Sequence, residues 1–413
     1  MQTQVAIIGG GAAGLCAAVA LKQRAKTANV VLLERLPRVG KKLLATGNGR
    51  CNITNRDANP ARWHGQDPAF CRTALERYDR TAVQRFFGTL GVEFTYDEQG
   101  RAYPYSLQAG AVVDALRFAA EELGVRILTD CLVEKIIPKK QSFVLEFGNQ
   151  TLTAQAVLAA GGLTAGGAAM GCDGGLLRLL KALGFATIPQ HAAIVQVKTE
   201  TDVVRQLKGI KINGISALYD KERIIRKEAG EILFCDYGLS GPPILQLSRA
   251  VEQTDRALEI GLDLMPEYSE EQVTEMLCAR AVSLQNRTAE NFFVGLLQKR
   301  VGQVLLKSVG VAAATPVSAL DAATLQTLAR QVKDWRFQVT GTTGMAHAQV
   351  ATGGLSTDGF LPETMMAKRL PGLFAAGEIL DVDGDCGGFN LQWAWASAMT
   401  AADGIRTFLG EFE

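Results

Sequence analysis

The sequence lacks the features that would indicate a metal site or an oxidising compartment. Its 413 residues include only three histidines, and its eight cysteines stand singly without a C-x-x-C pair. A metal site needs clustered ligands and a disulfide framework needs regularly spaced cysteines, so neither is expected. Isolated free cysteines fit a reducing cytoplasm, which is the predicted compartment.

Charge of one sign and long apolar runs are also missing. The formal net charge is +1, with 43 basic and 42 acidic residues. No net field therefore recruits nucleic acid or an acidic membrane surface. No run of about 18 apolar residues is free of charge, so no transmembrane helix is expected. Residues 1–21 are apolar, but they lack the basic start of a signal peptide.

The chain is long, and the pattern of its apolar residues changes along its length. At 413 residues it is too long for one compact core. Both ends show alternating strand and helix patterns, residues 191–264 are rich in hairpins, and residues 269–330 are helical in period. The simplest reading is a doubly wound α/β domain, built from both ends, that carries a β module and a helical module as insertions.

A glycine fingerprint stands near the start of the chain. Gly9-x-Gly11-x-x-Gly14 follows a strand-like stretch at residues 4–8 and opens an Ala/Leu-rich helix from about Ala13. Gly9 permits a tight turn, Gly11 lets the backbone approach a pyrophosphate, and Gly14 lets helix and strand pack closely. The pattern predicts dinucleotide binding; the alternative is a glycine-rich turn in an ordinary α/β protein.

Two acidic residues bear on which dinucleotide binds. Glu34 ends the next strand, where it can accept hydrogen bonds from a ribose diol and would repel the phosphate of NADP. Near the other end, residues 372–378 indicate a strand that ends in Glu378, a carboxylate suited to a ribityl hydroxyl. Residues 381–390 then lead into a helix whose N-terminus can stabilise negative charge on reduced flavin. The C-terminal region therefore favours FAD.

Two longer stretches resemble one flavoprotein family. Residues 40–55, which include GNGRCNITN, resemble its GxKLLxSGxGRCNxTN stretch, and residues 377–395 resemble its GExLDVDGxxGGYNLQWAW segment. Leu239–Pro242 and Gly353–Leu355 match further signatures, and the resemblance runs from about residue 4 to 405. This is the BaiN-like, or aminoacetone oxidase, family of FAD-binding proteins, within the wider glutathione-reductase-like fold.

The resemblance implies a fold, a cofactor and domain boundaries. The expected fold class is α/β, a doubly wound (Rossmann-like) FAD-binding domain with an inserted β-barrel-like module and a small inserted helical module. The expected cofactor is FAD. The predicted domains are 1–190 plus 341–413 for FAD binding, 191–266 plus 325–340 for the barrel-like module, and 267–324 for the helical module.

The predicted cofactor-binding residues combine the fingerprint with the positions that match the family. They are Gly9, Gly11, Ala12, Ala13, Gly14, Glu34, Arg35, Lys42, Gly47, Gly49, Arg50, Cys51, Asn52, Val133, Ala160, Gly161, Gly377, Glu378, Asp385, Gly388, Asn390 and Leu391. No catalytic residue is assigned. Relatives often carry Thr-His before the Gly-x-Ser-Gly-Pro turn, whereas Cys235-Asp236-Tyr237 stands there in this chain.

Four side chains and one segment near these motifs are open to more than one interpretation. Cys51 and Cys386 either take part in redox chemistry or pack beside the flavin. Trp393 and Trp395, two apart on a helix, face different ways, so at most one meets the flavin. The segment 101–106 resembles the family's GRxFPxS turn, and it either faces the substrate or forms a rigid proline turn.

The predicted function is that of an FAD-dependent oxidoreductase that transfers hydride between the flavin and a small organic substrate. NAD(P)H and O2 are the alternative redox partners, and amine oxidase and NAD(P)H-dependent reductase both stay open. A flavin-bearing binding protein, RNA- or protein-directed and with little turnover, is the alternative class. The basic residues between 205 and 227 are interspersed with acids, so a solvated face is favoured over a nucleic-acid surface. Neither nucleic acid nor a membrane is an expected partner.

Overall fold

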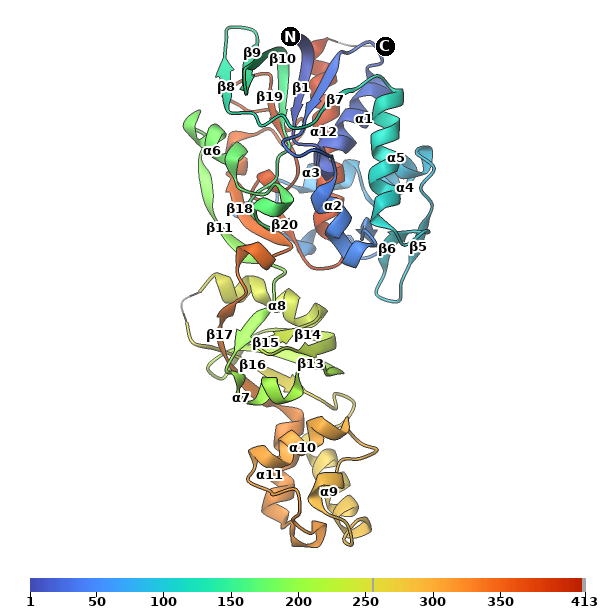
Figure 1. The fold of residues 1–413 in the computed structure, drawn as a ribbon, viewed down its shortest axis with the longest axis vertical. Helices are drawn as coiled ribbons and strands as arrows, with labels where there is room; N and C mark the ends of the chain where they lie inside the picture. The colour runs from blue at the N-terminus through green and yellow to red at the C-terminus, as the bar shows by residue number, and fades with distance from the viewer. Residues whose placement is uncertain (255, 411–413) are drawn as a thin grey trace. The chain divides into compact units, whose positions relative to one another are not determined.

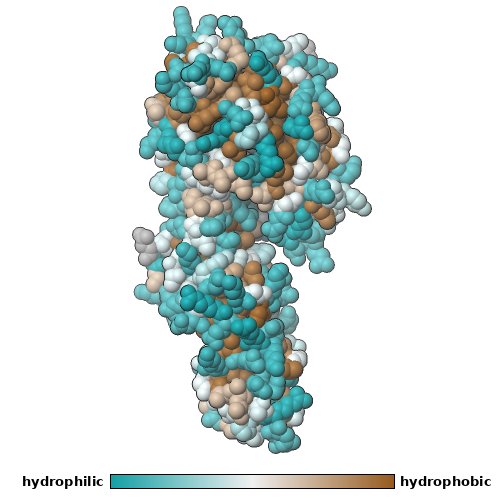
Figure 2. Space-filling view, viewed as in Figure 1, coloured by the Kyte–Doolittle hydropathy of each residue, from teal (hydrophilic) through white to brown (hydrophobic). Residues whose placement is uncertain are grey.

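The computed structural model describes residues 1–254 and 256–410, which fall into two compact units (Figure 1). Unit 1 comprises Met1–Ala192 together with the chain from Met345 onward, and unit 2 comprises Ala193–Gly344. Among the described residues no helix is long and apolar enough to cross a membrane. In the view of Figure 2, hydrophilic and hydrophobic side chains are mixed over the surface of each unit.

Unit 1 is built on a seven-stranded sheet. Its strand order is β7-β2-β1-β10-β9-β8, with β19 also paired to β10. The strands β7, β2, β1, β10 and β19 run parallel, and β9 and β8 are antiparallel to their neighbours. Strand β2 is buried along its whole length, as the apolar run at residues 30–33 predicts for a parallel sheet. The doubly wound α/β fold class expected from the sequence is confirmed.

The strands of unit 1 are β1 Gln2–Ile8, β2 Val30–Leu33, β3 Thr54–Asn55, β4 Trp63–His64, β5 Phe94–Tyr96, β6 Arg101–Pro104, β7 Arg126–Leu128, β8 Lys135–Pro138, β9 Phe143–Phe147, β10 Gln150–Ala159, β11 Thr187–Ala193, β18 Val350–Leu355, β19 Leu373–Ala375 and β20 Asp383–Gly384. Its α-helices are α1 Ala12–Arg24, α2 Lys41–Ala45, α3 Arg72–Arg77, α4 Arg80–Thr89, α5 Ala109–Glu122, α6 Gly175–Ala182 and α12 Phe389–Leu409.

The two ends of the chain pack together in unit 1. Helix α1, blue in Figure 1, lies against helix α12, red in the same view. The thiol of Cys16 on α1 donates to the backbone carbonyl of Trp395 on α12. The helix expected from about Leu391 begins two residues earlier, at Phe389. The chain therefore closes the domain with its C-terminal segment.

One stretch with a helical period is interrupted. Residues 73–90 carry apolar positions at helical spacing, but the structure has two helices there, α3 and α4. Asp79 stands between them, and its side chain accepts a hydrogen bond from the backbone N–H of Ala82. This is an N-cap, and it starts a new helix where the apolar period alone predicts continuity.

Unit 2 contains a closed barrel of order β12-β15-β14-β13-β16-β17. Its strands are β12 Val197–Thr199, β13 Lys211–Asp220, β14 Arg223–Phe234, β15 Gly238–Ser240, β16 Leu258–Asp263 and β17 Trp335–Thr342. Its α-helices are α7 Thr201–Val204, α8 Pro242–Glu252, α9 Glu270–Ser283, α10 Lys299–Ser308 and α11 Ala322–Lys333. The alternating apolar residues at 194–198 predict a strand there, but β12 begins only at Val197.

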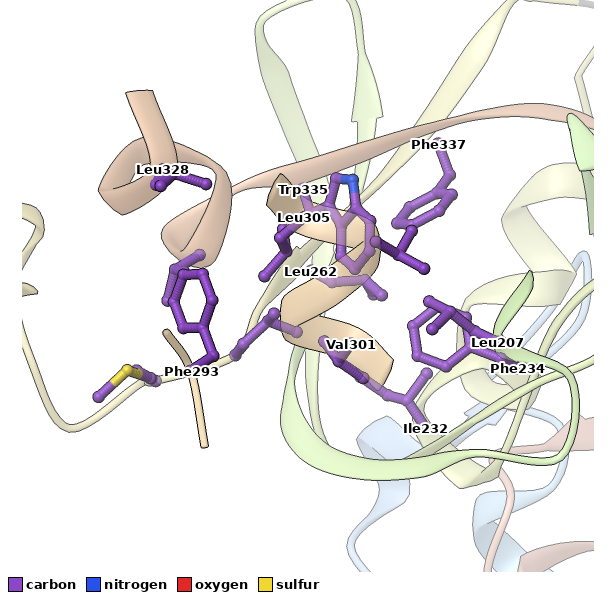
Figure 3. Packing of buried hydrophobic residues seen from close by; sticks show 14 of the residues in the cluster. Leu207, Ile232, Phe234, Leu262, Phe293, Val301, Leu305, Leu328, Trp335 and Phe337 are labelled. Atoms are coloured by element: carbon purple, nitrogen blue, oxygen red, sulfur yellow. The ribbon is translucent and has the colours of Figure 1, made fainter. Parts of the chain in front are cut away.

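The barrel and the helices α9–α11 share one hydrophobic core. Figure 3 shows barrel side chains such as Phe234 and Trp335 and helical side chains such as Leu305 and Leu328, all members of one buried cluster. Phe293, which precedes α10, belongs to the same cluster. The barrel and the helical segment thus form one compact unit, while the three-domain boundaries stay a prediction.

Candidate functional site

In the first glycine loop, the fold requires glycine at positions 9 and 14, whereas Gly11 faces open space. A Cβ on Gly9, whose φ is +108°, would lie 2.6 Å from the carbonyl oxygen of Ala160. A Cβ on Gly14 would lie 1.8 Å from the carbonyl oxygen of Gly9. At Gly11, by contrast, a Cβ would meet no described protein atom within 4 Å. The space beside Gly11 is therefore available to a ligand, as the fingerprint predicts for a pyrophosphate.

Helix α1 begins at this loop, and no described side chain accepts a hydrogen bond from the N–H groups of its first turn. Gly11 is the N-cap residue, and none of the described side chains caps the helix or adds an acid to its first turn. Ala12 and Ala13 open the helix, so their small side chains leave the approach clear. A helix N-terminus with free N–H groups attracts an anion through its hydrogen bonds and its dipole.

The carboxylate of Glu34 is held in place beside the loop. One oxygen accepts from the backbone N–H of Gly10 and the other from that of Leu36, each at 2.8 Å. The residue is only 8% exposed, so its orientation is fixed by these bonds. Each carboxylate oxygen has a further lone pair for a ribose hydroxyl. Glu34 therefore fits the predicted ribose contact.

Two neighbouring segments flank Glu34. Cys131, after β7, donates its backbone N–H to the carbonyl of Glu34 at 2.9 Å, and the predicted Val133 follows, almost fully buried. Arg35 forms an ion pair with Asp173 at 2.5 Å, and this hydrogen bond lowers the pKa of the Asp173 carboxyl. The pair links the end of β2 to the glycine-rich segment that precedes α6.

The N-terminal and C-terminal motifs meet at Gly377. A Cβ on Gly377 would lie 2.8 Å from the Cβ of Ala13, so the two motifs are in direct contact. The next residue, Glu378, forms an ion pair with Lys42 at 2.7 Å and accepts from the backbone N–H of Ala351 at 3.0 Å. The structure thus brings the predicted Lys42, Gly377 and Glu378 together with the fingerprint, although Glu378 lies more than 300 residues further along the chain.

The loop that follows α2 has an unusual backbone. Gly47 and Gly49 have φ of +57° and +80°, and the non-glycine residues Asn48 and Cys51 have φ of +55° and +60°. Such left-handed conformations are costly for residues with a Cβ and cluster at ligand sites. A Cβ on Gly49 would meet no described atom within 4 Å, so this loop also borders open space.

Cys51 itself is buried beneath this loop. Its exposed fraction is 0%, and burial raises the pKa of its thiol to about 12. Redox exchange requires an accessible thiolate. The packing interpretation of Cys51 is therefore favoured over a redox role.

Asn52 carries an unsatisfied polar atom. Among the described residues, its Oδ1 is the single buried side-chain oxygen or nitrogen without a hydrogen-bond partner. A Cβ on Gly388 would lie 2.6 Å from this oxygen, so Asn52 reaches the segment that leads into α12. A buried acceptor left unpaired is costly, and a ligand N–H would remove that cost. The flavin ring carries such an N–H, so the residues present fit this group.

The segment before α12 is held by residues that the sequence analysis did not identify. Asp385 is nearly buried and pairs with His64 at 2.8 Å and with Arg62 at 3.3 Å. Strand β20 pairs with β4, which brings these residues together across more than 300 positions of sequence. No local pattern around His64 or Arg62 signals this contact, and only the pairing of β4 with β20 reveals it.

The amide of Asn390 shapes the start of α12. Its Oδ1 accepts from the N–H of Gly384 at 2.8 Å, and its Nδ2 donates to the carbonyl of Gly384 at 2.7 Å. Gly388 is the N-cap residue with φ of +102°, and no side chain in the described chain caps the helix there. The half-buried Leu391 follows in the first turn. The uncapped N–H groups can face negative charge, as the sequence predicts.

The two tryptophans of α12 serve the packing of unit 1. Trp393 and Trp395 are 1% and 0% exposed. The indole N–H of Trp393 donates to the carbonyl of Gly377 at 3.1 Å, and that of Trp395 to the carbonyl of Ile53 at 3.0 Å. Each indole thereby holds one segment of the candidate site, at Gly377 or at Ile53, through a hydrogen bond.

The strand end at Ala160 and Gly161 completes the arrangement. Ala160 donates its N–H to the carbonyl of Ile8 at 2.8 Å, at the end of β1. A Cβ on Gly161 would lie 2.8 Å from the side chain of Leu176, so that side chain would have to move to accommodate it. All the predicted cofactor-binding residues lie in unit 1, and their contacts with the cofactor remain a prediction.

Comparisons with known proteins agree with this geometry. The family described as "HI0933-like protein Rossmann domain" matches residues 3–404. The 3-dehydro-bile acid delta(4,6)-reductase of Clostridium scindens is 33% identical over 402 residues, which are 96% of this chain and 98% of that protein. The ribosomal RNA dihydrouridine synthase of Haemophilus influenzae is 29% identical over 404 residues, 96% of each chain.

A solved structure shares the fold. The 3-ketosteroid delta1-dehydrogenase from Sterolibacterium denitrificans superimposes with a TM-score of 0.52 at 12% identity, over 98% of this chain and 99% of that one. At this identity the likeness shows the fold alone.

Proposed function

The chain belongs to the HI0933-like Rossmann family, and from this premise we propose that it reduces a carbon–carbon double bond conjugated to a carbonyl group. The protein is an FAD-binding oxidoreductase, and FAD is its cofactor. The family resemblance drawn from residues 40–55 and 377–395 is thereby confirmed.

The names of the two relatives support one common chemistry. A delta(4,6)-reductase of a 3-dehydro-bile acid removes double bonds that are conjugated to a 3-oxo group. A dihydrouridine synthase saturates the ring double bond of uridine, which is likewise conjugated to a carbonyl. When bound, FAD supplies hydride for such a reduction. The single observation that carries the proposal is the 33% identity to the bile-acid reductase over 96% of this chain.

The chain's own residues have separate tasks in this proposal. The open space at Gly11 and the uncapped start of α1 hold the pyrophosphate, and the fixed carboxylate of Glu34 holds the adenosine ribose. Glu378, aligned by Lys42, holds the ribityl chain. With FAD bound, the uncapped start of α12 would stabilise the negative charge of the reduced ring and so would favour its reduction.

A small molecule is the favoured substrate. Three of the basic residues in and near the β13–β14 hairpin are paired with acids: Lys208 with Asp236, Lys211 with Glu231 and Arg226 with Glu228. Nucleic-acid binding depends on cations that are available to phosphates. The net charge of +1 adds no general attraction.

An RNA uridine is the second candidate substrate. It is favoured by the 29% identity to the ribosomal RNA dihydrouridine synthase over 96% of each chain. The reaction would be the same reduction of a conjugated double bond, but the bond would belong to a uracil base in an RNA chain. RNA binding would weaken steeply as the salt concentration rises, whereas binding of a steroid-sized enone would not.

The test separates the donor from the acceptor. Purified holoprotein is mixed anaerobically with NADH, NADPH or a panel of amines, and bleaching of the flavin absorbance is followed. The reduced protein is then mixed with a 3-oxo-Δ4 steroid, with a uridine-containing RNA, or with O2. We expect bleaching by a nicotinamide nucleotide and rapid return of the yellow colour with the steroid enone.

The controls define what would overturn the proposal. The Gly11→Val variant, prepared in parallel, should bind no FAD and show neither phase. Bleaching by an amine, followed by peroxide release and no reaction with either alkene, would make the protein an amine oxidase. Reoxidation by RNA alone would replace the small substrate by the RNA candidate.

A further inference from the structure

One tyrosine borders the candidate site without a hydrogen-bond partner. Tyr103 lies on β6 and is 3% exposed. Among the residues that the structure describes, none hydrogen-bonds to its hydroxyl, whereas the hydroxyls of Tyr78 and Tyr96 bond to Asp403 and Gln84. The fully buried unpaired atoms of the described chain are limited to Asn52 Oδ1. The Tyr103 hydroxyl is therefore unpaired but still reachable from solvent.

Tyr103 lies beside the loop that follows α2, which is predicted to hold the flavin. A Cβ on Gly47 would lie 3.4 Å from Cε1 of its ring, and the guanidinium of Arg50 lies over the ring, 4.7 Å from its centroid. Arg50 has no ion-pair partner among the described residues. A mostly buried phenol and a free cation thus meet at the edge of the site.

We propose that Tyr103 is the catalytic proton donor in the reduction of the conjugated double bond. This inference rests on the proposed function and adds the acid that the sequence analysis left unassigned.

The proton and electron balance of the step is simple. When bound, the reduced cofactor would supply hydride to the alkene carbon farther from the carbonyl, and the alkene π electrons would shift toward the carbonyl oxygen to give an enolate. The O–H bond of Tyr103 then breaks, and a C–H bond forms at the carbon next to the carbonyl, which restores C=O. Tyr103 is left as a phenolate, and water returns its proton. The alkene has gained two electrons and two protons.

The surroundings of Tyr103 suit this task. Burial raises the pKa of its phenol above the usual value, although the charges of Arg101 and Arg50 act in the opposite direction. The group is therefore protonated throughout the neutral range and ready to donate. The cation of Arg50 over the ring stabilises the phenolate that the step produces.

Two neighbouring groups are less suited. His64 is tied through its Nε2 to Asp385, a contact that fastens β4 to β20. The Cys51 thiol is fully buried and cannot reach a substrate. Tyr103 combines an unpaired acidic hydrogen with access from solvent.

The test compares two tyrosines of one turn. Tyr103→Phe removes the hydroxyl and keeps the ring beneath Arg50, and Tyr105→Phe is the matched control, because Tyr105 is 76% exposed. Both variants should retain FAD and the thermal stability of the wild type. In Tyr103→Phe, reoxidation of the anaerobically reduced protein by the steroid enone should slow about 100- to 10,000-fold, the usual range for loss of a general acid. Tyr105→Phe should match the wild type.

The pH profile gives a second readout. The wild-type reoxidation rate should stay level through neutral pH and fall only at alkaline pH beyond the ordinary tyrosine range, because burial raises the pKa of Tyr103. Tyr103→Phe should lose this falling limb. The wild-type profile can be measured even if the variant folds poorly, and a wild-type rate without an alkaline falling limb would overturn the assignment.

The outcomes separate the two proposals. If the enone reoxidises the wild type and Tyr103→Phe equally fast, Tyr103 is not the acid and the proposed function stands. If no enone reoxidises the wild type, the proposed function fails and the acid role fails with it.

Discussion

Four helices, two in each unit, begin in contrasting ways. In unit 1, α1 and α12 start at Gly11 and Gly388, and within the described chain no side chain caps either helix. In unit 2, α9 and α11 start at Ser269 and Asp321, whose side chains accept hydrogen bonds from the first turn. A capped helix has satisfied some of its first N–H groups within the chain, whereas these two glycine starts leave theirs free for the predicted ligand. The contrast holds for these four helices and not for each unit as a whole, because α4 of unit 1 is capped by Asp79 and α8 of unit 2 starts at Gly241 without a side-chain cap.

The largest effect is expected at the start of α1. Gly11 has φ of −82°, an ordinary value for any residue, and a Cβ there would meet no described atom within 4 Å. Gly11→Val should therefore fold normally but exclude the pyrophosphate and abolish FAD binding. Flavin absorbance after gel filtration measures the result. Gly14→Val is the contrasting variant, because its Cβ would overlap the carbonyl of Gly9 and disrupt unit 1.

The next effect concerns the carboxylate beside that helix. Glu34→Ala should weaken FAD binding by about 1–3 kcal/mol, the cost of leaving ribose hydroxyls unpaired, which is roughly 5- to 150-fold in Kd. Titration of the apoprotein with FAD, followed by flavin fluorescence, measures this loss. Glu34→Gln keeps one acceptor and should lie between the wild type and Glu34→Ala. An unchanged Kd in Glu34→Ala would remove this residue from the site.

The start of α12 should affect the flavin's potential rather than its retention. Asn390→Ala removes both bonds to Gly384 and loosens the turn before the helix. The protein should stay yellow, while the reduction potential falls by the equivalent of about 1 kcal/mol for a helix terminus, roughly 20 mV for a two-electron couple. Anaerobic dye-linked titration measures it. An unchanged potential would mean that α12 only packs the domain.

The smallest effect on the cofactor is expected in unit 2. Ser269 and Gln272 form a capping box at the start of α9. Ser269→Ala should lower the free energy of unfolding of unit 2 by about 1 kcal/mol and leave FAD affinity unchanged. Denaturant unfolding monitored by circular dichroism, with FAD fluorescence in parallel, checks both. Ser269→Asp should restore the stability, and loss of FAD in Ser269→Ala would contradict the contrast between the two sets of helices.

Local patterns predicted the first βαβ unit well. Residues 4–8 and 30–33 are short apolar runs, and both lie in parallel strands of the observed sheet. Helix boundaries were less accurate, because a single capping residue such as Asp79 can override the apolar period. The strand at residues 194–198 was displaced, since alternation of apolar residues does not specify where a barrel strand finds its partner.

The sequence by itself determined the residues that bind through the backbone. Gly9 and Gly14 are required by a tight turn and a close approach within the fold, and Gly11 by the expected approach of a pyrophosphate, and these constraints are local and therefore visible in a motif. The family resemblance followed from such motifs for the same reason. Glu34, which directly follows β2, was also identified from such a motif. Glu378 was identified as well, but it does not end a strand as predicted, because β19 ends at Ala375 and Glu378 lies in the 3-10 turn Gly377–Ile379.

The tertiary structure alone decided which distant side chains meet. The pairing of His64 with Asp385, the unpaired amide oxygen of Asn52 and the position of Tyr103 beneath Arg50 have no local signature. Each depends on loops brought together by strand pairing and helix packing. The energy of such a contact depends on burial and distance, and neither is set until the chain has folded.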